Sequence, residues 1–97
     1  MLFIGKIKQL RESQQIPQRQ LAAVLEIDTA TYCKIERGER KAKREQVVTI
    51  ANTLKVSEEE LLTLWLADQV YSVLRYEQNV SEILNVVQEN IEEYERT

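Results

Sequence analysis

Hydrophobic residues recur along this chain at helical spacing, with polar residues between them. Phe3, Ile7 and Leu10 lie at positions i, i+4 and i+7, the spacing of one buried helix face. A chain with one proline and two glycines has few helix breakers, so the pattern predicts an all-α fold. Continued along the chain, the same period predicts helices over about residues 2–13, 18–25, 44–54 and 58–75.

Residues 18–38 predict two short helices joined by a tight turn at residues 26–27. Asp28 is a good N-cap for the second helix, because its carboxylate can accept hydrogen bonds from exposed backbone amides. Gly38 would end that helix as a left-handed C′ residue, and Tyr32 and Ile35 would face inward. This is the layout of a helix-turn-helix, in which the second helix can enter a DNA major groove.

Two cap signals divide the C-terminal forty residues. Ser57 and Glu60 form a capping box that opens the helix from residue 58 to about 75 or 76, and residues 79–82 carry a second cap signal. The helix that begins at residue 58 carries more apolar residues than a single narrow buried stripe requires. The last helix has apolar residues at the 4, 3, 4, 3 steps of a coiled coil: Val80, Leu84, Val87, Ile91 and Tyr94.

The overall net charge of -3 hides an asymmetry between the two parts of the chain. Residues 1–56 contain eleven cationic and six acidic side chains, a balance of +5, whereas residues 57–97 have a balance of -8. The split favours a basic half that binds nucleic acid and an acidic half that faces elsewhere.

Composition argues against an enzyme. The chain has no histidine, one cysteine (Cys33) and no glycine-rich loop, so no acid–base, metal or phosphate-binding constellation is available. We therefore expect no metal and no cofactor.

No apolar run approaches the roughly 18 residues that span a bilayer. Lys6 and Lys8 interrupt the N-terminus where a signal peptide would be apolar, so we expect a cytoplasmic protein without membrane attachment.

The segment from Ile4 to Leu61 resembles the Xre-type (phage repressor and Cro-like) helix-turn-helix family. The residues that carry the resemblance are Gln18, Leu21–Ala22, Ile35–Gly38, Ile50–Ala51 and Leu54–Val56. It implies a compact five-helix domain over residues 1–61 that dimerises and binds short inverted repeats in double-stranded DNA. Residues 62–97 would then form a C-terminal helical extension, a helical hairpin. Glu26 and Lys55 stand where the family often has glycine, which predicts backbone strain there.

The resemblance implies which residues contact bases, because the family places these contacts at the start and middle of the recognition helix. They are Thr29, Ala30, Thr31 and Lys34. Lys34 would donate to guanine O6 and N7, and the small side chains would touch thymine methyl groups. The alternative is that all four are ordinary exposed helix residues.

Contacts to the DNA backbone are expected on both sides of the recognition helix. Gln18 resembles the family's phosphate clamp, and Arg19 is a weaker candidate. A basic cluster follows the recognition helix and would give affinity and salt dependence rather than sequence choice; the alternative is a solvated loop. Its members are Arg37, Arg40, Lys41, Lys43 and Arg44.

Glu36 has the wrong charge for a helix that faces DNA. In the family the equivalent glutamate pairs with an arginine of the first helix, which Arg11 matches here. The resemblance thus implies a structural Arg11–Glu36 ion pair.

The apolar faces of the C-terminal helices allow two arrangements: folding back on the DNA-binding domain, or a dimer interface. The expected interface residues are Leu61, Leu64, Trp65, Val73, Val87 and Ile91. The preferred function is a homodimeric, sequence-specific transcriptional regulator of the repressor or restriction-modification controller type. The alternative is an antitoxin-like module whose acidic C-terminal helices bind a partner protein.

Overall fold

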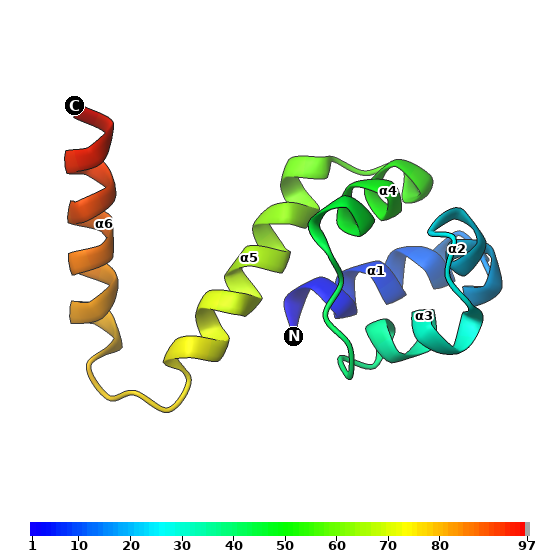
Figure 1. Cartoon of the computed structure of the whole chain (residues 1–97), viewed down its shortest axis with the longest axis horizontal. Helices are drawn as coiled ribbons and strands as arrows, with labels where there is room; N and C mark the ends of the chain where they lie inside the picture. The colour runs from blue at the N-terminus through cyan, green and yellow to red at the C-terminus, as the bar shows by residue number, and fades with distance from the viewer. Residues whose placement is uncertain (97) are drawn as a thin grey trace.

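The computed structural model describes residues 1–96, which form six α-helices and no strand (Figure 1). The all-α prediction is therefore confirmed. None of these helices combines the length and the apolar character that crossing a bilayer requires. In chain order, the helices are α1 (Leu2–Ser13), α2 (Gln18–Val24), α3 (Thr29–Glu36), α4 (Arg44–Leu54), α5 (Glu58–Leu74) and α6 (Val80–Arg96).

Helices α1 to α4 and the first turns of α5 pack around one hydrophobic core. The core forms because each helix turns its apolar stripe inward, which removes that surface from water. Leu61 is completely buried in this core. Its prediction as a dimer-interface residue is therefore wrong, because the side chain already packs inside one copy. Other fully buried members are Ile7, Leu21, Tyr32, Val47, Ile50 and Leu54.

Local hydrogen bonds fix where the helices begin. The Asp28 carboxylate accepts from the Thr31 backbone amide at 2.6 Å and caps α3. The Ser57 hydroxyl accepts from the Glu60 amide at 3.2 Å and caps α5. These contacts satisfy backbone donors that have no partner within the first helical turn.

Left-handed backbone geometry marks the helix ends. Gly38 has φ of +79°, and a Cβ atom there would lie 3.2 Å from the Ile4 side chain, so glycine suits the position. Glu26 and Lys55 also have positive φ, 58° and 60°, as expected from the family pattern. A side chain in this conformation crowds its own backbone and costs about 1–2 kcal/mol.

Asp68 ties α5 to the start of α1. Its two carboxylate oxygens accept hydrogen bonds from the backbone amides of Leu2 (3.0 Å) and Phe3 (2.9 Å). No side chain within α1 caps this end, so a residue of α5 satisfies donors that local sequence leaves open. The buried carboxylate fixes the angle at which α5 crosses α1.

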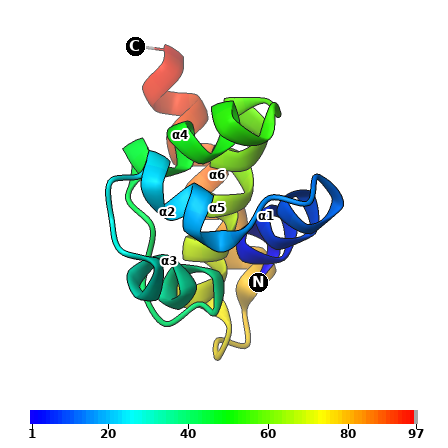
Figure 2. The same cartoon turned by 90° about the vertical axis from the view of Figure 1, so that its right-hand side faces the viewer.

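Helix α6 lies apart from the rest of the molecule (Figures 1 and 2). Helix α5 extends away from the packed helices α1 to α4. The chain then turns, and α5 and α6 form the two arms of an open V. No residue of α6 is buried. The radius of gyration is 15.9 Å, larger than the roughly 13 Å of a compact domain of this length. The structure therefore contradicts the arrangement in which α6 folds back on the DNA-binding domain. The predicted boundary between residues 61 and 62 falls inside α5.

Candidate nucleic-acid interface

Helices α2 and α3 and the turn between them lie at the end of the molecule opposite α6 (Figures 1 and 2). The turn is closed by backbone hydrogen bonds from the Glu26 amide to the Ala23 carbonyl and from the Ile27 amide to the Ala22 carbonyl, both 3.1 Å. Ile27 is half-buried against the core. The two helices are thus held at a fixed angle, and α3 lies across the surface.

Helix α3 has a buried and an exposed side. Tyr32 and Ile35 point into the core, as the sequence predicts. Thr29, Ala30 and Lys34 are exposed on the other side, as a helix that reads base edges requires. Thr31, which was expected to contact bases, is half-buried at the edge of this face, as is Cys33.

The structure contains the Arg11–Glu36 ion pair. The Arg11 guanidinium donates two hydrogen bonds to the Glu36 carboxylate, from Nε at 2.9 Å and from Nη2 at 2.8 Å. Its third nitrogen donates to the Ile16 carbonyl at 3.0 Å. The exposed fractions are only 11% for the Arg11 side chain and 3% for that of Glu36. This paired geometry joins α1 to α3 and leaves little of either charge facing the DNA-binding surface.

Burial and charge act in opposite directions on Glu36. Burial raises the pKa of the carboxyl, but the hydrogen bonds and charge of Arg11 outweigh it, so the pKa lies below its ordinary value. Burial, followed by the neighbouring Glu36 carboxylate, raises the pKa of the Tyr32 hydroxyl. The Tyr32 hydroxyl lies near this carboxylate with a geometry that falls short of a hydrogen bond, and no other described atom pairs with it. Glu36 is thus ionised and Tyr32 neutral near neutral pH.

Gln18 belongs to the same network. Its amide nitrogen lies 3.4 Å from the Glu36 carboxylate, and its amide oxygen accepts from the Cys33 thiol at 3.1 Å. In the chain alone, these bonds join Gln18 at the start of α2 to α3. The expected phosphate contact of Gln18 stays a prediction, and it would compete with these bonds.

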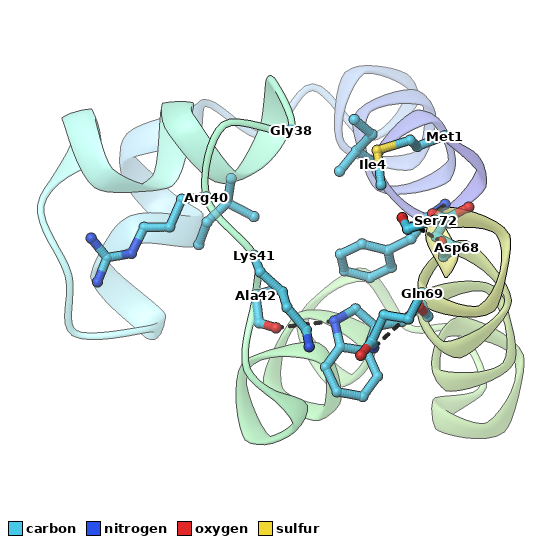
Figure 3. A pocket seen from close by; sticks show the side chains of 12 residues that line it. Met1, Ile4, Gly38, Arg40, Lys41, Ala42, Asp68, Gln69 and Ser72 are labelled. Atoms are coloured by element: carbon cyan, nitrogen blue, oxygen red, sulfur yellow. Dashed lines mark hydrogen bonds between the residues drawn. The ribbon is translucent and has the colours of Figure 1, made fainter. Parts of the chain in front are cut away.

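The basic cluster follows α3 directly: it spans the loop between α3 and α4 and ends at Arg44, the first residue of α4. Arg37 forms an exposed ion pair with Glu39 at 2.9 Å, which partly offsets its charge. Arg40 points away from the cavity behind the loop, toward the outside (Figure 3). The remaining predicted phosphate contacts, Arg19, Lys41, Lys43 and Arg44, are all exposed.

Trp65 of α5 contacts this loop and fixes its position, a role that the sequence analysis did not predict. Its indole nitrogen donates to the Ala42 carbonyl at 3.0 Å (Figure 3). The Lys41 ammonium and the Arg44 guanidinium lie 5.6 Å and 5.7 Å from the ring centroid, within the range of a cation–π contact. The cavity beside the ring measures about 180 Å³ and is lined mainly by apolar groups such as Phe3 and Ile35. Helix α5 therefore positions the basic loop.

No cluster of three or more potential metal ligands occurs within residues 1–96. Together, the buried anchor of α3, its exposed polar side and the adjacent cations define a helix-turn-helix DNA-binding protein.

Comparison with known families agrees with this class. The helix-turn-helix family matches residues 7–61, more than half of the chain, so the protein belongs to this family of DNA-binding transcriptional regulators. The Xre-type resemblance is thereby confirmed. Comparisons with curated proteins and with solved structures gave no match.

Proposed function

We propose that this protein is a sequence-specific transcriptional regulator that binds an inverted-repeat DNA operator as a homodimer. The observation that carries the proposal is the presentation of α3. The helix is anchored underneath by the buried Arg11–Glu36 pair and exposes Thr29, Ala30 and Lys34. A fixed recognition helix with small residues at its start can approach base edges closely, and its lysine then reaches a guanine.

The basic loop supplies the sequence-independent part of the affinity. Arg40, Lys43 and Arg44 are exposed beside α3, where the DNA backbone would pass if α3 enters the major groove. Each cation that neutralises a phosphate releases a condensed counterion, so binding would weaken steeply as salt rises. The small number of long side chains on α3 leaves part of the specificity to DNA shape.

Two-fold symmetry of the operator and the exposed apolar surface support a dimer. One short recognition helix contacts few base pairs, whereas a two-fold dimer reads two half-sites about one helical turn apart. Val73, Val87 and Ile91 have exposed fractions of 76%, 48% and 46%, which leaves them available for contact with a second copy. Leu64 and Trp65 are half-buried against the core and contribute less to such an interface.

Selection of bound sequences from a pool of randomised duplexes tests the proposal. We expect an inverted repeat with half-site centres about 10 base pairs apart. Lys34→Ala should change the preferred base at one position in each half-site. Glu45→Ala, an exposed change at the start of α4, is the matched control and should leave the selected sequence unchanged. Failure to enrich any sequence in dilute salt would refute the proposal.

A further inference from the structure

Three residues of the apolar stripe of α6 stay largely open to solvent in one copy of the chain. Leu84, Val87 and Ile91 lie on one face of the helix at the coiled-coil spacing, and between 43% and 48% of each residue is exposed. A helix this amphipathic is stable in a protein only when its apolar face packs against something. We therefore expect the apolar stripe of α6 to pack against another molecule.

The arms of the V formed by α5 and α6 enclose an apolar crevice of about 330 Å³. Val70 and Leu74 line it from α5, and Val80 and Leu84 line it from α6. Leu66 and Val73 are further exposed apolar residues of α5, outside the lining of the crevice. A single helix laid along this crevice would cover the inner faces of both arms at once.

The positions of the acidic residues on α6 indicate what kind of partner helix would fill this crevice. Glu82, Glu89 and Glu92 fall on the side of α6 away from the stripe, given the helical repeat of 3.6 residues. The positions that flank the stripe as far as residue 90 carry no charge: Ser81, Ile83, Gln88 and Asn90. A basic partner would gain most from acids beside the contact, which are absent at these positions. Two identical acidic helices, by contrast, can meet there without bringing like charges together.

Pairing of α6 with α6 alone would be a weak arrangement. The helix has 17 residues, only about two heptads. The branched residues Val80 and Val87 occupy the positions where a two-stranded parallel coil prefers leucine. A stable interface also buries roughly 800 Å² on each partner, which favours contact with α5 as well as α6.

We propose that the occupant is a second copy of this chain, and that α6 of each copy enters the α5–α6 crevice of the other. The outer half of α5 and the whole of α6 from two copies then form an intermolecular four-helix bundle. This inference rests on the proposed homodimer and goes beyond it by naming the structure that joins the two DNA-binding domains. The bundle lies at the end of each copy away from α3, so both recognition helices stay free.

Sedimentation velocity on the full-length protein at tens of micromolar tests the bundle. We expect a dimer for the unmodified chain and a monomer for both Val70→Glu and Ile91→Glu, because each change places a charge in the buried seam. Asn85→Glu/Val86→Glu adds two charges on the outer side of α6 and should remain a dimer. All four residues are exposed in one copy, so helical circular dichroism and Trp65 fluorescence should show an intact body in every variant.

DNA binding separates failure of the bundle from failure of the proposed function. Ile91→Glu should bind the inverted repeat at least tenfold more weakly and bind an isolated half-site as the unmodified chain does. A chain that stays dimeric in Ile91→Glu and still binds its selected duplex overturns the bundle alone. A monomeric unmodified chain overturns both the bundle and the proposed homodimer. A dimer that Ile91→Glu dissociates but that binds no duplex supports the bundle and overturns the proposed function.

Discussion

Removing one partner of the Arg11–Glu36 pair should strongly destabilise the DNA-binding domain. Arg11→Met keeps most of the apolar stem of the side chain but leaves the Glu36 carboxylate buried without its cation. The exposed fraction of the Glu36 side chain is only 3%, so water cannot replace the lost partner. Loss of one member of a buried ion pair costs about 3–5 kcal/mol. Domains of this size are stable by roughly 5–15 kcal/mol, so the variant would retain only part of its stability.

Urea unfolding followed by circular dichroism measures this effect in a double-mutant cycle. The variants are Arg11→Met, Glu36→Gln and the two changes combined. Since both single changes break the same contact, the double variant should lose much less than their sum, with a coupling energy of about 2–3 kcal/mol. A coupling below about 0.5 kcal/mol would show that the pair does not join α1 to α3 energetically and would refute the reasoning.

The same pair predicts a dependence of stability on pH. The pKa of Glu36 is lower in the folded protein than its ordinary value of 4.5. Its stabilising contribution is therefore complete above that value and is lost as pH falls below it and through the folded pKa. Urea unfolding at a series of acidic pH values should show a weaker pH dependence in Glu36→Gln than in the unmodified chain. Equal slopes in the two proteins would contradict the pKa shift.

Three further predictions test other parts of the structure. Lys43→Ala should weaken binding to all duplexes alike and reduce the salt slope by about one, as fluorescence anisotropy titrations at several salt concentrations would show; an unchanged slope would exclude a phosphate contact. Lys55→Gly should relieve left-handed strain and raise the free energy of unfolding by about 0.5–1 kcal/mol in urea, whereas a loss would show that the position is unstrained. Asp68→Ala should cost about 1–3 kcal/mol and accelerate hydrogen exchange at the Leu2 and Phe3 amides, and unchanged exchange would contradict the cap.

Helical periodicity and cap residues were sufficient to predict most of the fold. The predicted starts of α1, α4 and α5 agree with the structure, and Asp28 caps α3 as expected. These features depend on contacts within a few residues of one another, which a single sequence displays directly. The Arg11–Glu36 pair spans 25 residues and was anticipated only because the family resemblance supplied it.

The features that were missed depend on contacts between distant segments. Asp68 caps an amide 66 residues away, and Trp65 bonds to a carbonyl 23 residues away, so neither role leaves a local pattern. Leu61 illustrates a different limit. An apolar residue near a helix start has the same appearance whether it faces the core of its own chain or a second copy, and only the packing of α5 shows that it is buried.

The orientation of Gln18 was also beyond a single sequence. The family pattern implied a phosphate contact, whereas the structure engages the amide with Glu36 and Cys33. A glutamine amide can donate and accept at the same time, so its neighbours in space decide which way it points.

Chemical-shift mapping tests the central claim that α3 is the surface that contacts DNA. Amide resonances of the ¹⁵N-labelled protein would be followed by NMR while the selected duplex is added. We predict the largest changes at residues 29–34 and in the basic loop at residues 40–44, with α6 unaffected. Unchanged resonances at residues 29–34 in the bound state would contradict the account.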